Sequence, residues 1–177
     1  MPDQANQAEP DTVNVFLAGI PDLTRRSRFP SLDPERANAV FKAMLDGGDS
    51  EAAILSVVGE LNERDDGSDW KARFILHALG THACGKGKDA ERAKVEAAFV
   101  KALQADHPAA IKTFLTMQLQ YIAQEQSIES LIAQFAANDV QLTDAVAATL
   151  TAIGELCKHL EFYLTGNQSR FIVQYVH

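Results

Sequence analysis

Between residues 34 and 165, apolar residues recur every three or four positions, which is the spacing of an amphipathic α-helix. Short polar segments that contain glycine, proline, aspartate or asparagine interrupt this spacing, and these residue types favour the ends of helices over their interiors. The pattern therefore predicts an all-α fold. The expected helices lie at residues 35–46, 50–63, 69–84, 89–104, 107–124, 127–137, 139–153 and 155–165.

The boundaries of the first and last expected helices rest on specific residues. Asp33 is a favoured N-cap residue, and Pro34 suits the first position of a helix because that position needs no N–H donor. The glycine pair 47–48 is expected to end this helix. Gly154 is expected to separate the helices at 139–153 and 155–165, because glycine weakens a helix interior.

The pattern also divides the chain into three parts. Residues 1–33 combine a polar start, one short apolar run and a loop, so we expect a disordered or irregular segment there. Residues 34–165 form the expected helical domain, and the whole chain of 177 residues suits one such domain. Residues 166–177 form a tail with an apolar end, which could cap the last helix pair.

Helices joined by short connections pack as antiparallel neighbours, and such pairs can close into a bundle or stack as repeats. The chain superimposes on itself at an offset of 31 residues, and one unit earlier at an offset of 40. Apolar residues coincide at both offsets. The coincident pairs include Ile111 with Leu142, Leu115 with Val146, Ile122 with Ile153, Ile75 with Leu115, and Leu79 with Leu119.

Three phrases at the ends of alternate expected helices carry a family resemblance: "LGTHA", "LQYIA" and "LTAIG". Together with the offsets, they resemble short HEAT repeats, which belong to the armadillo-like helical proteins. The resemblance covers residues 34–165 and implies a right-handed α-α superhelix of three to four antiparallel helix pairs. A closed helical bundle is the alternative architecture. Stacking is physically reasonable, because one helix pair alone cannot bury its apolar face.

The composition argues against two classes of function and indicates a cellular compartment. The formal net charge of −8 and a pI near 5.0 argue against general binding to nucleic acid, which needs a basic surface. No apolar run approaches the roughly 20 residues that cross a bilayer, so no membrane association is expected. The two cysteines, Cys84 and Cys157, form no CxxC motif, which favours a reducing compartment and hence the cytoplasm.

The stretch "LHALGTHACGKGKD", residues 76–89, is the strongest candidate for chemistry. It holds His77, His82 and Cys84, which are ligand types for a metal. On a continuous helix, however, His82 points about 140° away from His77, so the three side chains cannot meet on one ion. We therefore interpret the stretch as a helix end and a turn. A metal- or ligand-binding enzyme that uses residues 77–88 is the alternative.

The resemblance to HEAT repeats implies a non-enzymatic module that binds a protein partner on its concave helix face, with no cofactor. One HEAT-like enzyme class, deoxyhypusine hydroxylase, binds iron through His-Glu dipeptides, and this sequence contains none. The acidic charge favours a basic or polar partner segment. The second helix of each pair is expected to line the concave face. Its polar residues are Glu60, Glu63, Arg92, Glu96, Glu129, Gln134 and Glu161.

Self-association is a further possibility at the level of sequence. The apolar tail "FIVQYV", residues 171–176, could pair with a second copy of the chain and form a homodimer.

Overall fold

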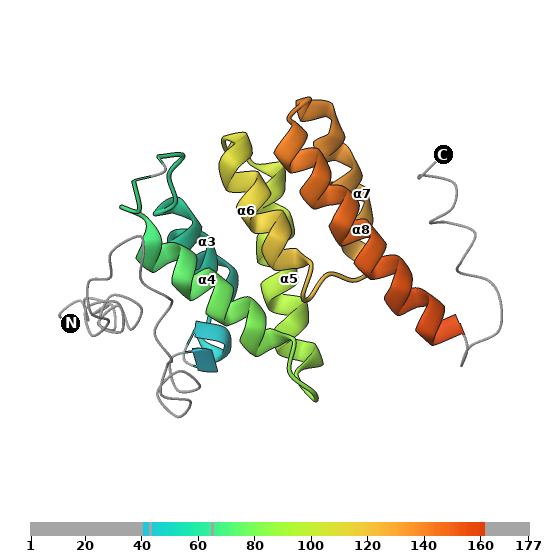
Figure 1. Ribbon diagram of the computed structural model, residues 1–177. Helices are drawn as coiled ribbons and strands as arrows, with labels where there is room; N and C mark the ends of the chain where they lie inside the picture. Colours follow the sequence, from blue (N-terminus) through green and yellow to red (C-terminus); the bar gives the residue numbers. More distant parts are fainter. Residues whose placement is uncertain (1–40, 43, 65, 162–177) are drawn as a thin grey trace, which may run out of the picture.

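The computed structural model describes residues 41–42, 44–64 and 66–161, with side chains up to residue 155 (Figure 1). Within these residues the chain forms helices and turns and no strand, which confirms the all-α class. The expected segments 1–33 and 166–177 lie outside the described residues. None of the described helices is both long and apolar enough to cross a membrane.

The described helices follow the sequence pattern closely in its middle part. Residues 41–42 and 44–46 are helical. The α-helices that follow are α3 (Ser50–Gly59), α4 (Trp70–Ala83), α5 (Asp89–Gln104), α6 (Ala109–Leu119), α7 (Ile128–Ala133) and α8 (Val140–Glu161). Two short 3-10 helices, η1 (Glu125–Ser127) and η2 (Gln134–Ala137), flank α7.

Side-chain caps fix where two of these helices begin. Asp49 accepts a hydrogen bond from the backbone N–H of Ala52, 2.8 Å away, at the start of α3. Asp139 accepts one from Leu142 in the same way at the start of α8, at 2.9 Å. Each aspartate thereby satisfies an N–H group that has no partner within the helix.

The helices form two rows (Figure 1). In the first row, α6 packs against both α4 and α8, and in the second row, α5 packs against both α3 and α7. Consecutive helices alternate between the rows, so helices within one row run in the same direction. The apolar stripe of each helix therefore faces the opposite row.

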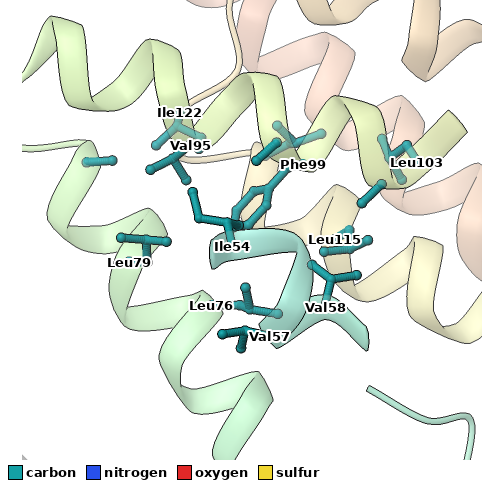
Figure 2. Close-up of a cluster of buried hydrophobic side chains, with 14 of the residues drawn as sticks. Ile54, Val57, Val58, Leu76, Leu79, Val95, Phe99, Leu103, Leu115 and Ile122 are labelled. Carbon is teal, nitrogen blue, oxygen red and sulfur yellow. The ribbon is translucent and has the colours of Figure 1, made fainter. Parts of the chain in front are cut away.

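The main core lies between the rows, around Phe99 of α5 (Figure 2). Ile54 and Val58 of α3 and Leu76 and Leu79 of α4 contribute to the same cluster, and all of them are buried. These residues belong to the stripes that the sequence pattern identified or lie directly beside them. The core is thus built by the spacing of apolar residues along each helix.

The structure corrects the expected boundary at Gly154. The two helices expected at 139–153 and 155–165 are one helix, α8, which continues without interruption to Glu161. Gly154 is buried within it. A glycine costs a helix interior only about 1 kcal/mol, which the packing of the neighbouring turns offsets.

Other expected helices are shorter than the pattern suggested. The helix expected at 107–124 is α6, which ends at Leu119. The helix expected at 127–137 divides into α7 and η2, and ends at Asn138 with a left-handed φ of 53°. Asparagine tolerates this conformation better than most residues, so it provides a sharp turn into α8.

Candidate functional site

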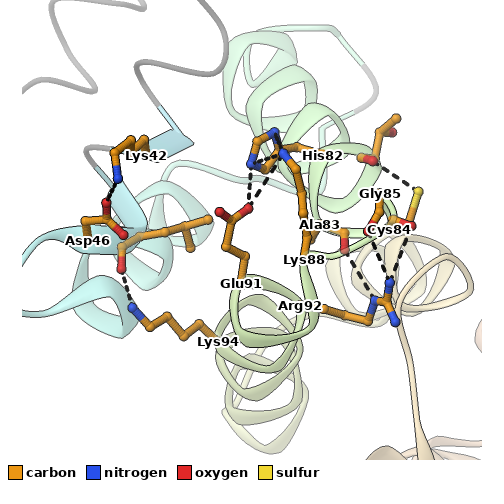
Figure 3. Close-up of polar contacts among 12 residues, drawn as sticks. Lys42, Asp46, His82, Ala83, Cys84, Gly85, Lys88, Glu91, Arg92 and Lys94 are labelled. Carbon is orange, nitrogen blue, oxygen red and sulfur yellow. Dashed lines mark hydrogen bonds and ion pairs between the residues drawn. The ribbon is translucent and has the colours of Figure 1, made fainter.

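The stretch 76–89 forms the end of α4 and the turn into α5, as the sequence analysis expected. The guanidinium group of Arg92, from α5, reaches back over this turn (Figure 3). Its Nε donates to the carbonyl of Ala83 at 3.3 Å, and its Nη2 donates to the carbonyls of Cys84 and Gly85 at 3.4 Å each. Arg92 therefore caps carbonyl groups that α4 leaves without a helical partner.

His82 lies in a polar cluster beside this turn, with its side chain only 10% exposed. Its Nε2 is 2.8 Å from a carboxylate oxygen of Glu91, and the ammonium nitrogen of Lys88 is 2.8 Å from each ring nitrogen (Figure 3). The ring of His82 is thus held between the side chains of Lys88 and Glu91 at the start of α5.

The structure does not bring the three candidate metal ligands together. His77 places Nδ1 2.9 Å from Oε1 of Gln118, whereas His82 faces α5. The thiol of Cys84 donates to the carbonyl of Thr81 at 3.0 Å. Across the described residues, no group of three histidine, cysteine, aspartate or glutamate side chains could hold a metal ion.

The burial of Glu96 contradicts its expected place on the binding face. It was predicted to be exposed on the concave side, but its side chain is fully buried. Its carboxylate accepts hydrogen bonds from the backbone N–H of Gln124 at 2.7 Å and from the side chains of Gln126 and Ser127. These three donors compensate the loss of water around the charge. Glu96 therefore holds the loop between α6 and α7 and cannot contact a partner.

Gln134 was also expected on the binding face, but its side chain is buried. Its side-chain amide donates a hydrogen bond to the carbonyl of Ser130 at 3.0 Å. Arg92 is half-buried and occupied in capping α4. Glu60, Glu63 and Glu129 are exposed, as expected. The side chain of Glu161 lies outside the described part of the structure.

The sequence contained a signal for the burial of Glu96. Glu96 precedes Phe99 by three residues and Leu103 by seven, and both of these residues are fully buried. The three positions share one face of α5. A glutamate within an apolar stripe indicates a buried acid with hydrogen-bond donors around it.

Two large apolar side chains that the sequence analysis did not single out lie on the outer face of the first row. Met117, on α6, and Tyr121, in the turn just after α6 ends at Leu119, are 51% and 53% exposed. We call this pair the α6 ridge. Both residues fall outside the stripe that carries Leu115 and Leu119 into the core. That position off the stripe was the signal that could have found them.

Neighbouring helices hold the α6 ridge in place. The ring of His77, from α4, contacts the ring of Tyr121 edge-on, with centroids 6.0 Å apart. On the other side, the hydroxyl of Thr149, from α8, donates to the carbonyl of Thr116 at 3.1 Å. The ridge therefore stands on a fixed surface, because both flanking helices are tied to α6.

Charged side chains also lie near the α6 ridge. The guanidinium carbon of Arg73, from α4, lies 4.9 Å from the ring centroid of Phe114, three residues before Met117. Glu125, four residues after Tyr121, is exposed. The ridge is therefore an apolar pair with charged side chains close by.

Comparison with known proteins gives no identity. Neither a family model, nor a curated protein, nor a solved structure matches the chain.

Proposed function

We propose that this chain is a non-enzymatic protein-binding scaffold, which holds an apolar segment of a partner protein on the outer face of the first row. The exposure of Met117 and Tyr121 carries this proposal. Met117 lies on α6, the middle helix of the row, and Tyr121 lies in the turn that follows it, and neither side chain belongs to the buried core. Methionine and tyrosine are also residue types that frequently anchor protein interfaces.

The proposed architecture behind this function is a superhelix of the short HEAT-repeat type. Three of the superimposed pairs support it: Ile111 with Leu142, Leu115 with Val146, and Ile122 with Ile153 are all buried. The alternation of helices between two rows supports it as well. Stacked helix pairs of this kind present a continuous face for partners.

The proposal moves the binding surface from the second row to the first. Two of the expected second-row contacts, Glu96 and Gln134, are buried, and Arg92 caps α4. The acids that remain exposed, Glu60 and Glu129 among them, are ordinary surface charges. The net charge of −8 supports a protein partner over nucleic acid, and the free thiol of Cys84 supports a cytoplasmic location.

Affinity capture followed by measurement with the purified partner tests the proposal. Proteins captured by the full chain are identified, and their binding is measured by calorimetry against Met117→Lys and Tyr121→Asp. We expect each variant to raise the dissociation constant by at least about 30-fold. Loss of one interface anchor that contributes about 2 kcal/mol has this effect.

The matched controls are Glu60→Lys and Glu129→Lys, which alter exposed charges on the second row. We expect them to leave the affinity within about twofold, as is usual for residues outside an interface centre. Loss of binding in the controls, with no effect of the ridge variants, would restore the second row as the binding face and refute the proposal.

A further inference from the structure

We propose that Asp66 and Gly67 form a site of spontaneous backbone isomerisation, at which the aspartate becomes an isoaspartate, and that Ser68 controls its rate. The site lies in the connection between α3 and α4. The proposal is independent of the proposed function, because the reaction needs only water and no partner.

The chain contains two Asp-Gly dipeptides, Asp46-Gly47 and Asp66-Gly67. Asp-Gly is the dipeptide most open to this reaction, because glycine has no β-carbon to crowd its backbone nitrogen. The two aspartates differ in their backbone structure. Asp46 is helical, whereas Asp66 lies exposed in a turn. The chain therefore offers a reference site for the same chemistry.

The reaction has two steps. The backbone nitrogen of Gly67 attacks Cγ of the protonated Asp66 carboxyl group, a C–N bond forms, and the carboxyl hydroxyl leaves as water with the amide proton. The product is a five-membered succinimide ring. Water then adds to the main-chain carbonyl carbon of the ring and its bond to nitrogen breaks, which leaves the chain running through Cβ and Cγ. No oxidant or reductant takes part.

The turn leaves the reacting groups close together and accessible. Within the part of the chain that the structure describes, the backbone N–H of Gly67 donates no hydrogen bond. Oδ1 of Asp66 accepts a hydrogen bond from the backbone N–H of Ser68 at 2.8 Å, so the side chain reaches back across Gly67. Gly67 itself has a φ of 76°, which suits glycine.

Asp46 has the opposite arrangement. Its helical backbone fixes the rotation about the Cα–C bond, so the nitrogen of Gly47 cannot approach Cγ unless the end of the helix opens. The carboxylate of Asp46 also forms an ion pair with Lys42. We therefore expect Asp46 to react more slowly than Asp66 in the folded chain.

Ser68 slows the reaction at Asp66 through its hydroxyl group. This hydroxyl donates to Oδ1 of Asp66 at 2.6 Å, and together with the backbone bond it lowers the pKa of Asp66 below 3.8. The charge of Arg64 lowers the pKa further. Only the protonated carboxyl group can lose its hydroxyl as water, so these contacts keep most of Asp66 in the unreactive form.

Isomerisation would disturb the start of α4, because it adds one atom to the backbone and moves the carboxylate. The Ser68 hydroxyl that binds Asp66 also accepts from the side-chain amide of Asn62 at 3.0 Å. Asp69 in turn accepts from the backbone N–H of Asn62 at 3.0 Å and from Nε of Arg73 at 2.9 Å. The turn and the first residues of α4 are thus connected.

Peptide mapping of the aged full chain tests the proposal. The chain is incubated at neutral pH and physiological temperature and digested with trypsin, which places Asp66 in peptide 65–71 and Asp46 in peptide 43–64. Mass spectrometry with electron-transfer fragmentation locates isoaspartate within each peptide. We expect it to form at least about fivefold faster at position 66 than at position 46, because the helix raises the barrier at the second site.

Urea-unfolded chain provides the control for intrinsic sequence effects. Without the helix and the turn, the two Asp-Gly sites should react at rates within about twofold of each other. Equal rates in the folded chain, or faster reaction at position 46, would overturn the proposal.

Ser68→Ala tests the controlling role of the hydroxyl. We expect isoaspartate at position 66 to form at least about twofold faster, because more of the carboxyl group is protonated at a given pH. Ser56→Ala removes an exposed hydroxyl from α3 and should leave the rate unchanged. An unchanged or slower rate in Ser68→Ala would refute this role.

Hydrogen exchange of the isomerised chain, purified by chromatography, tests the structural consequence. We expect amides 70–73, at the start of α4, to exchange at least about fivefold faster than in the original chain. The first turn of α8, which Asp139 caps, should be unaffected. Equal exchange of amides 70–73 in the two forms would show that the turn does not hold α4 and would overturn this part of the proposal.

Discussion

Glu96 is the residue whose role differs most from its sequence pattern, because a charged side chain sits fully buried among three hydrogen-bond donors. All three donors belong to the loop between α6 and α7, residues 124–127. One side chain of α5 therefore sets the path of a loop that comes about thirty residues later in the chain. A carboxylate suits this task because it offers two oxygens to several donors at once.

Glu96→Lys is expected to lower the free energy of unfolding by at least about 3 kcal/mol, because it leaves a buried ammonium group facing unpaired donors. Urea unfolding followed by circular dichroism measures the change. Glu129→Lys makes the same exchange at an exposed position and should stay within about 0.5 kcal/mol of the original chain. Equal stability of the two variants would contradict the role assigned to Glu96.

Asp66 provides a second prediction at the level of single residues. The hydroxyl and the backbone N–H of Ser68 both donate to its carboxylate, at 2.6 and 2.8 Å, and these bonds hold the pKa of Asp66 below its usual value of 3.8. A folded pKa below the unfolded one favours the folded state above the unfolded pKa, and this contribution disappears as pH falls through the folded pKa.

Removing the hydroxyl should therefore raise the pKa of Asp66. In Ser68→Ala the larger contribution is lost while the backbone bond remains, so we expect the pKa to move up towards its usual value without fully reaching it. Carboxyl chemical shifts followed by NMR as a function of pH measure it. A pKa that stays where it was would mean that another group controls this carboxylate.

At the scale of helices, Gly80 is the buried residue of α4 that faces α6. A β-carbon built at this position would lie 3.8 Å from the carbonyl oxygen of Gln118 and 4.0 Å from the ring of Phe99, which is ordinary van der Waals contact. There is room for a methyl group and little more. A side chain larger than that of alanine at position 80 would therefore meet α6.

Gly80→Ala should stabilise the protein by about 0.5–1 kcal/mol, because alanine favours a helix and the site accepts its methyl group. Gly80→Leu should instead destabilise it by about 1–3 kcal/mol, because the larger side chain pushes α4 away from α6. Urea unfolding of both variants measures the difference. Destabilisation by alanine alone would mean that the helices are closer than the distances above indicate.

The helices also show what the sequence could and could not predict. The apolar spacing predicted for α4 is confirmed, since Ile75 and Leu79 are both buried. Local spacing determines which side of a helix faces the core, so such positions are readable from the sequence. The continuation of α8 through Gly154 was not, because it depends on tertiary packing that outweighs a weak local preference.

The candidate site was less predictable than the helices. The alignment of alternate helices suggested a binding face, but burial of Glu96 depends on a loop from elsewhere in the chain. The position of Met117 and Tyr121 off the apolar stripe marked them as candidates for exposure. Whether such residues stay uncovered depends on the neighbouring helices as well.

At the scale of the whole molecule, the two rows distribute packing unevenly. α5 packs against α3, α4, α6 and α7, whereas α3 packs against α4 and α5 among the labelled helices. A helix in contact with more neighbours can open only when more of the structure is lost. Local stability should therefore be greatest near the middle of the second row.

Hydrogen exchange at backbone amides can measure this distribution. We expect the amides in the middle of α5, around Phe99, to exchange more slowly than those in the middle of α3, around Ile54. Both residues are fully buried, so the comparison separates the number of packed neighbours from simple burial. Equal rates in the two helices would indicate that the rows unfold as one unit.

Under the proposed function, the number of helices in the first row also limits the length of a bound segment. Neighbouring helices pack about 8–10 Å apart, so the face that runs from α4 across α6 to α8 is about 16–20 Å wide. An extended strand rises about 3.3 Å per residue, so six residues cross that width. Under the proposed function, a segment bound across the three helices would therefore be about six residues long. Each additional helix in this row would lengthen the bound segment by about three residues.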